Sequence, residues 1–376
     1  MRKILIAAAL LLCFCFADTA YASDITDSQA RAVGADRLSD GLPEETADSL
    51  EQIGIKSADT RSVLDLTMDR IFGALLGLSA EKSKNPVTAA FILLGMVILS
   101  ALLREFNSSL HEGAPQEQVF QFVIMLSVCT VILTPISGAV IDTSRAIEGF
   151  CSFLLMFVPV FAGVMTVSGQ PVTASAYSLL QVGFAQFFSF VAAMLLTPLI
   201  NIYLAFCVVG SVSEHSGIPS ITALIQRVIT VVLLFCSTVF IGLLTVQSFV
   251  ASSSDALTVR TGKFLIESFV PVVGGAVSEA LLSIQGSLKL LKSSVGAFGI
   301  ISAAVTFLPV LVELAIWNIS LALCAAFADM FSLGQVSSLL KSAANAVKLL
   351  LAIVLICGVL IVITTGIMLV IGMGNG

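Results

Sequence analysis

The 34 residues YSLLQVGFAQFFSFVAAMLLTPLINIYLAFCVVG (Tyr177–Gly210) contain no aspartate, glutamate, lysine or arginine. At a helical rise of 1.5 Å per residue they would extend about 51 Å, whereas the hydrocarbon core of a bilayer is about 30 Å thick. An uncharged apolar run of this length predicts a membrane-spanning helix. Pro198 lies inside the run and predicts a kink or a break there.

The whole chain has the composition of a membrane protein. Of its 376 residues, 57% are hydrophobic and only 11% are charged, whereas a soluble domain carries about 25% charged residues. The apolar runs are continuous and do not alternate with polar residues, which favours helices over a β-barrel. We therefore expect an all-α, polytopic helical membrane protein.

Six further apolar runs complete a set of seven predicted spans. They are Pro86–Leu103, Val119–Ile141, Phe150–Val167, Leu224–Val250, Phe298–Phe327 and Val347–Ile371. An eighth, weaker segment, Phe264–Ile284, is interrupted by Pro271, Gly274 and Gly275. It can cross the membrane, re-enter it or lie at its surface, so the number of spans is seven or eight.

The N-terminal part has a different character. Residues 1–22 resemble a secretory signal: Arg2 and Lys3 precede an apolar stretch, and a small-residue cleavage site ends at Ala22. An uncleaved anchor is the alternative. Residues 23–85 predict an exported, acidic helical region, because 12 of the 24 acidic residues lie between Asp24 and Glu81.

The exported region contains one amphipathic pattern. Leu64, Met68, Ile71 and Leu75 recur on one face of a helix. So few large apolar residues make a poor independent core, and we expect the region to pack on another surface. Residues 86–376 then form the transmembrane domain.

Loop charges give a weak orientation. Arg260, Lys263, Lys289 and Lys292 flank the eighth segment. If that segment does not cross, all four share one side, which the positive-inside rule assigns to the cytoplasm. This agrees with an exported N-terminus and an odd number of crossings in between.

Two short motifs occur twice in the same order. NIYLAFC (201–207) returns as NISLALC (318–324), and FVPV (157–160) returns at 269–272. The pattern predicts duplicated units at about 119–210 and 224–327, and chance matching among apolar residues is the alternative. Three crossings in each unit would invert the halves, as in many transporters. The expected helix breaks are Pro159, Pro198, Pro271, Gly274, Gly275 and Pro309.

Three polar residues within apolar segments are candidate pathway residues: Asn201, Glu313 and Asn318. An amide facing lipid is unfavourable, so each asparagine should point into the bundle and hydrogen-bond across it, for about 0.6–2 kcal/mol. Glu313 is the strongest candidate, because a charge at the bilayer centre costs roughly 2.5–3.5 kcal/mol. It either lines a cavity and binds protons, or acts as a hydrogen-bonded structural group.

The sequence lacks the common motifs for phosphate-loop and zinc-protease chemistry. The chain has neither a GxxxxGK[ST] phosphate loop nor an HExxH metal motif, and its two histidines, His111 and His215, lie outside the apolar segments. No basic patch suggests nucleic acid. We expect no catalytic residue, no cofactor and no metal, and hence a protein that is not an enzyme.

The stretches TGKFLIESFVPVVGG (261–275) and EHSGIPSITALIQ (214–226) resemble the bacterial stage III sporulation protein AE family. The resemblance extends over essentially the whole chain. It implies a role in endospore formation, in a channel-like complex of proteins made in the mother cell. Other stage III proteins would then be its partners, including ring-forming members and an ATPase. It also implies a location in the mother-cell membrane around the forespore.

Two mechanisms remain open within this resemblance. As a conduit, the protein would carry small molecules along a path lined by broken helices and by Asn201, Glu313 and Asn318. As a scaffold or platform, it would hold ring proteins through residues 23–85, with or without forming oligomers of its own. A free-standing secondary transporter unrelated to sporulation is the alternative from another class.

Overall fold

The computed structural model describes residues 30–55, 68–110, 116–191, 193, 197–212, 218–269 and 274–370. The predicted signal peptide therefore lies outside the described residues. Within them every regular element is a helix, which confirms the all-α class. The elements are η1 (Ala35–Gly41), α3 (Glu44–Ile53), α5 (Met68–Lys82), α6 (Lys84–Leu110), α7 (Gln116–Val167), α8 (Pro171–Phe190), α9 (Thr197–Val212), α10 (Ile218–Phe269), α11 (Gly274–Met330) and α12 (Gly334–Val370).

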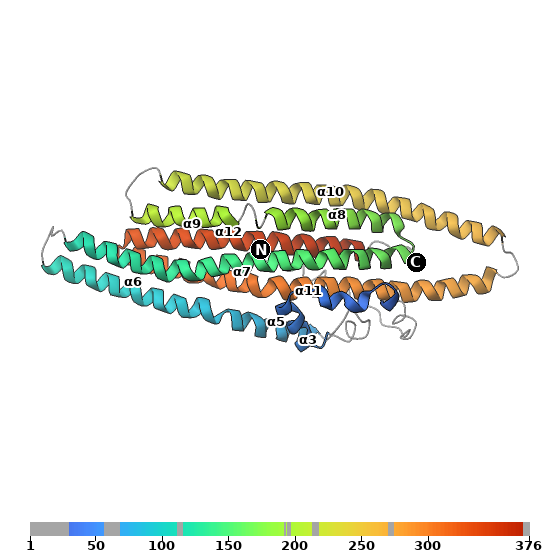
Figure 1. Cartoon of the computed structure of the whole chain (residues 1–376), viewed down its shortest axis with the longest axis horizontal. Helices are drawn as coiled ribbons and strands as arrows, with labels where there is room; N and C mark the ends of the chain where they lie inside the picture. Colours follow the sequence, from blue (N-terminus) through green and yellow to red (C-terminus); the bar gives the residue numbers. More distant parts are fainter. Residues whose placement is uncertain are drawn as a thin grey trace.

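The long helices lie side by side in an elongated bundle (Figure 1). Helices α8 and α9 follow one another in a single row, and along the chain α6, α7, this row, α10, α11 and α12 alternate in direction. Helix α12 is central, because it packs against α7, α8, α9, α10 and most extensively α11. The docked segments η1, α3 and α5 lie on one side, against α7 and α11.

Five helical segments in the described residues are long and apolar enough to cross a membrane: Gly73–Glu105, Phe122–Val167, Ser220–Gln247, Gly286–Met330 and Gly334–Val370. Thr197–Gly210 is apolar but shorter. These helices fit a multi-pass membrane protein, whereas the predicted count of seven spans finds only loose support. Several helices exceed one bilayer: α7 and α10 have 52 residues each and α11 has 57, or about 78 Å and 86 Å at helical rise.

The predicted separation of Val119–Ile141 from Phe150–Val167 is wrong, because α7 is continuous through both. The polar stretch between them is part of the helix. Its side chains bond along the helix: Arg145 pairs with Asp142 at 3.7 Å, and Ser144 Oγ donates to Glu148 Oε1 at 3.1 Å. Pairs three and four residues apart stabilise a helix through such a stretch.

The predicted helix breaks have mixed outcomes. Pro159 and Pro309 lie inside continuous helices, so a break there is wrong; a proline removes one backbone bond, and packing on neighbouring helices can compensate. Pro198 is the second residue of α9, and α8 ends at Phe190. Residues 192 and 194–196, between the two helices, lie outside the described residues, so the break at Pro198 stays a prediction; the proline itself falls in the first turn of α9, where it is tolerated.

The eighth predicted segment is not one crossing helix. Helix α10 ends at Phe269 and α11 begins at Gly274, with Gly275 in its first turn, so the segment is divided between two helices of a hairpin. Pro271 lies outside the described residues. Each proposed repeat unit thus contributes two lengthwise passes, α7 with α8–α9 and α10 with α11. Two passes in each unit do not supply the three crossings that an inverted repeat requires, and the inverted arrangement stays a prediction.

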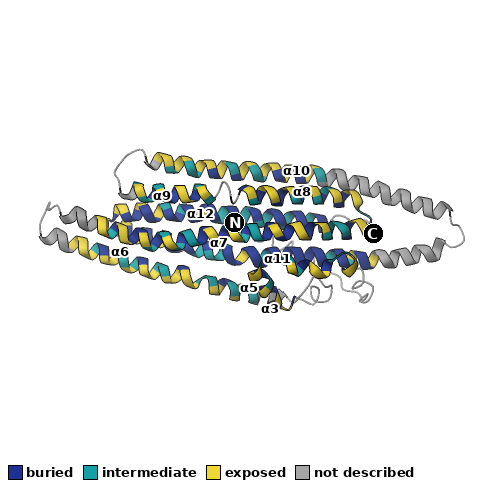
Figure 2. Cartoon of the chain, in the orientation of Figure 1, coloured by how far each residue is buried: buried dark blue, intermediate teal, exposed yellow. Residues whose placement is uncertain are grey.

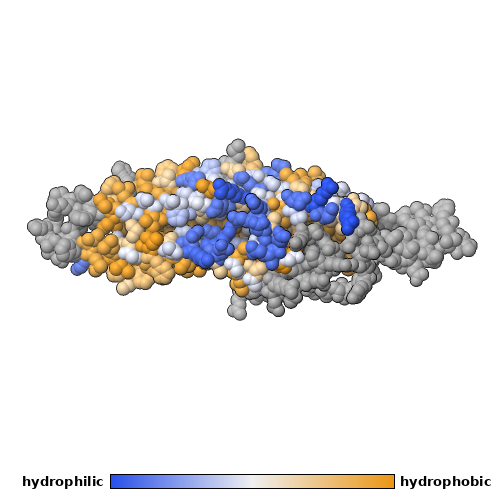
Figure 3. Space-filling model, turned by 60° about the horizontal axis from the view of Figure 1, so that its bottom comes forward, coloured by the Kyte–Doolittle hydropathy of each residue, from blue (hydrophilic) through white to orange (hydrophobic). Residues whose placement is uncertain are grey.

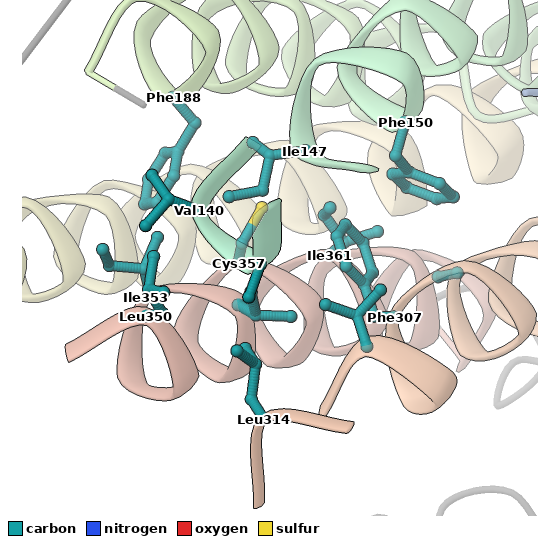
Figure 4. Close-up of a cluster of buried hydrophobic side chains, with 14 of the residues drawn as sticks. Val140, Ile147, Phe150, Phe188, Phe307, Leu314, Leu350, Ile353, Cys357 and Ile361 are labelled. Carbon is teal, nitrogen blue, oxygen red and sulfur yellow. The ribbon is translucent and has the colours of Figure 1, made fainter. Parts of the chain in front are cut away.

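A row of aromatic rings fills the core between α7 and α11. Phe150, Phe153, Phe157 and Phe161 follow one face of α7, and their successive ring centroids are 5.3, 5.5 and 5.5 Å apart. From α11, Phe307 lies 5.0 Å from Phe150. Figure 4 shows Phe150 and Phe307 near Ile353, Cys357 and Ile361 of α12, and Figure 2 shows buried residues gathered where α7, α11 and α12 meet. Rings at these spacings attract one another beyond the burial of their area.

Candidate functional site

The N-terminal region packs on the bundle itself. Leu38 and Leu50 are buried, with 1% of each side chain exposed. The hydroxyl Oγ1 of Thr46 lies 3.0 Å from Oγ1 of Thr306 on α11, a buried contact between residues 260 positions apart. Because Leu50 follows Thr46 by one helical turn, both lie on the face of α3 that meets the bundle.

Two glycines allow this close approach. A Cβ at Gly41 would lie 2.5 Å from Sδ of Met156, and one at Gly149 would lie 2.9 Å from Cγ of Pro43. Both distances are shorter than van der Waals contact. The region described at 30–55 is thus fitted to α7 and α11 by shape. Of the predicted amphipathic stripe, Leu75 on α5 is buried, whereas Leu64 lies outside the described residues.

The outer surface of the docked region is acidic. Its exposed carboxylates are those of Asp36, Asp40, Glu44, Glu45, Asp48 and Glu51, against exposed Arg31 and Arg37. Figure 3 shows hydrophilic residues concentrated at mid-length on the side that carries these helices, with apolar residues toward the end where α6 ends. The docked helices therefore present charge to water and bury apolar residues against the bundle.

A ring of charged residues lies where the docked region meets the bundle, and we call it the polar girdle. It comprises Glu45, Lys82, Asp142, Arg145, Glu148 and Glu313. Lys82 Nζ lies 2.8 Å from Oε2 of Glu45. The half-buried carboxylate of Glu313 accepts a hydrogen bond from the Trp317 indole and interacts with the charges of Lys82, Asp142 and Glu45.

The polar girdle also touches the interruption between α8 and α9. Thr197 Oγ1, at the first residue of α9, lies 3.4 Å from Ser144 Oγ, which donates to Glu148. A helix N-terminus carries partial positive charge, so a carboxylate near it is favourable. Thr143, Ser144 and Thr197 line a cavity of about 10 Å³ with aliphatic residues of α7, α9 and α12, close to the room needed by one water molecule.

The two asparagines of the repeated motif have different surroundings. Asn318 is half-buried, and its Nδ2 donates to the backbone oxygen of Ala344 on α12 at 2.9 Å. Asn201 is exposed on α9, so the expectation that it points into the bundle is wrong. The inward polar contact of α9 comes from Tyr203, whose hydroxyl lies 3.3 Å from the backbone oxygen of Ser342.

The position of each residue around its helix explains why the two asparagines differ in burial. In the first motif Tyr203, Leu204 and Cys207 are buried, and in the second the matching positions Ser320, Leu321 and Cys324 are buried as well. The first position of the motif falls at the edge of that buried face. A neighbouring helix therefore decides whether its amide is covered. The shared phase supports the proposed duplication, which stays a prediction.

The three candidate residues do not converge on one cavity. Glu313 faces the docked helices, Asn318 is bonded to α12, and Asn201 is exposed. Sequence reasoning gave little weight to a polar row that the structure buries on α8, namely Thr173, Tyr177 and Gln181; the Tyr177 hydroxyl has no hydrogen-bond partner among the described residues. Their spacing of four residues in an apolar helix was the available signal.

A second polar contact lies near the start of α8. Lys292 on α11 is 3% exposed, and its Nζ donates to Oε1 of Gln170 at 2.9 Å. Gln181 is fully buried, and neither of its amide atoms has a protein partner among the described residues. Buried groups of this kind in a membrane bundle are common along transport paths, and they also serve as structural contacts.

The family profile of stage III sporulation protein AE matches residues 56–372, more than four-fifths of the chain. The chain belongs to this family. Stage III sporulation protein AE of Bacillus subtilis (strain 168) is 24% identical over 261 residues, which cover 69% of this chain and 63% of that relative. The match thus spans less than two thirds of the relative's length. No solved structure matches.

Replacing Asn318 with leucine should destabilise this family member modestly. The change removes the contact to Ala344 between α11 and α12, and such interhelical bonds contribute about 0.6–2 kcal/mol. We expect the free energy of unfolding in mixed micelles to fall by that amount. Asn201→Leu is the matched control and should cause no loss in monomeric micelles. Equal effects at both positions would contradict the assigned contact.

Proposed function

We propose that this chain is a multi-pass membrane platform of a complex formed by stage III sporulation proteins. It would lie in the mother-cell-derived membrane around the forespore, with its signal peptide cleaved and the docked region in the space outside the cytoplasm. The docked region would hold extracytoplasmic partner proteins. Family membership supports the setting, since the family is named for sporulation.

The main observation behind the proposed platform function is that residues 30–55 pack closely against the helix bundle. Through Thr46 and Thr306 this region is fixed to the same bundle that crosses the membrane. Because its apolar side chains are turned to the bundle, its acidic outer face is held in a fixed position. A partner bound there would be fixed relative to the membrane, which is what a platform requires.

The packing of the bundle supports the platform over a conduit within one chain. The row from Phe150 to Phe161 occupies the centre between α7 and α11, so a solute passing there would have to displace stacked rings. One observation favours the conduit as the second candidate. The buried polar row of Thr173, Tyr177 and Gln181 could line a path between α8 and α12.

Sporulating cells can distinguish these two functions. The chromosomal copy is replaced by Glu313→Gln or Gln181→Leu, and both spore yield and co-purification of other stage III proteins are measured. A platform retains both, since neither residue lies on the acidic outer face. Normal complex assembly with lost forespore development would establish the conduit instead, because only transport would have failed.

A free-standing transporter makes a different prediction. Its gene would not depend on neighbours that encode an ATPase and ring-forming proteins, and its deletion would not block sporulation. Inspection of the neighbouring genes therefore tests this alternative. Finding such neighbours supports the platform, and their absence together with normal sporulation of a deletion strain overturns it.

A further inference from the structure

Two amide side chains stand out on the outer side of α8 and α9. Gln186 and Asn201 are exposed, and their neighbours on the same surface are mostly apolar, including Phe190 and Ile202, which are 61% and 46% exposed. Neither amide has a hydrogen-bond partner among the described residues. An amide in contact with lipid is unfavourable unless another group bonds to it.

Both amides lie outside the buried faces of their helices. Helix α8 buries Tyr177 and Gln181 and packs mainly on α7 and α10, and α9 turns Tyr203 toward Ser342 of α12. Gln186 is exposed on the outer side of α8, and Asn201 is exposed beside the buried face of α9. Because the two helices follow one another in a row (Figure 1), the amides stand at two heights along the exposed side of that row, which we call the α8–α9 face.

We propose that the α8–α9 face binds a second copy of this chain. Copies inserted by the same route share one orientation in the membrane, so a two-fold axis normal to the bilayer brings equal heights together. Gln186 then faces Gln186 of the partner subunit, and Asn201 faces Asn201 of the partner subunit. A primary amide both donates and accepts hydrogen bonds, so it is complementary to itself.

The exposed faces of α6 and α10, where their side chains are described, do not offer this complementarity. The exposed face of α6 presents Phe91 and Leu102, and that of α10 presents Leu234 and Phe235. Threonines on the exposed faces, such as Thr130 and Thr238, bond to their own helix. Lipid tails can cover such surfaces without leaving a polar group unpaired. The α8–α9 face instead carries two amides that would gain hydrogen bonds from a partner subunit. No atom lies within 4 Å of where a Cβ would stand at Gly183, so a partner helix has room to approach α8 closely there.

The test uses the purified full-length protein in liposomes at decreasing protein-to-lipid ratio, with dimers counted by single-molecule photobleaching. The expected result is a dimer that Asn201→Leu and Gln186→Leu each weaken about threefold to twentyfold, the range of interhelical polar contacts in membranes. Thr130→Leu is the matched control on an exposed face and should leave dimerisation unchanged.

Cysteine crosslinking locates the contact independently. Asn201→Cys should form a disulfide between copies on mild oxidation, identified in the linked peptides by mass spectrometry, whereas Phe91→Cys on α6 should not. Monomers at every ratio overturn the proposal. So do dimers that neither amide substitution weakens, or preferential crosslinking at position 91. None of these results affects the platform function, because no sporulation partner takes part.

Discussion

Gly299→Leu is expected to prevent α7 and α11 from packing and to leave little folded protein. A Cβ at this position would lie 2.4 Å from Cζ of Phe157, and the side chain of leucine extends further. Phe157 cannot move aside, because Phe153 and Phe161 stack against it on either side. Overpacking a well-packed core costs roughly 1–3 kcal/mol or more, and we expect the upper end.

Two further variants isolate the cause. Gly242→Leu on α10 is the matched control, since no atom lies within 4 Å of a Cβ there; it should be neutral or slightly stabilising, because leucine favours helix over glycine by up to about 1 kcal/mol. Adding Phe157→Ala to Gly299→Leu should recover part of the loss, a coupling that a double-mutant cycle measures. Thermal unfolding in detergent is the readout, and equal melting of the two glycine variants would refute the clash.

Leu50→Asp is expected to release the N-terminal region while the long helices stay folded. Leu50 is 1% exposed in the interface with the bundle. An unpaired carboxylate buried there would cost several kcal/mol, more than a short docked segment can offset. Hydrogen exchange of η1 and α3 should therefore rise to the rate of open chain, with unchanged exchange in α7, α11 and α12.

The same variant carries a functional consequence. If the acidic outer face must be held in place, Leu50→Asp should abolish spore formation with the protein still in the membrane. Asp48→Asn lies on the exposed side of α3 and is the structural control, which should leave exchange unchanged. Full protection of α3 in the Leu50→Asp protein would show that docking does not depend on this contact.

Hydropathy predicted the class of the fold but not the connectivity of its helices. Uncharged runs are visible in the sequence, so helices that suit a membrane could be expected from Tyr177–Gly210 alone. The continuity of α7 could not be predicted, because a polar stretch in the sequence is equally compatible with a loop and with a solvated turn of helix. In the fold, the pairs of Asp142 with Arg145 and of Ser144 with Glu148, together with packing of η1 against α7, support the continuous helix.

The candidate site residues could likewise be found from the sequence, but their contacts in the fold could not. Glu313 and Asn318 were found because polar residues are rare in apolar segments, and both have polar partners in the fold. The direction in which Asn201 points depends on which face of α9 meets α12, which composition does not encode. Pro159 and Pro309 failed as predicted breaks for a related reason. A proline marks a missing backbone bond, while neighbouring helices determine whether the axis continues.

The length of α7 has a mechanical consequence. A straight rod of about 78 Å could lie wholly within a 30 Å hydrocarbon layer only if inclined by about 67° from the membrane normal, whereas spanning helices incline by 0–40°. Within that range, roughly 40–50 Å of the rod must stand clear of the acyl chains. If α7 spans the bilayer within that range, a group attached to its far end would be held at a set distance from the lipid.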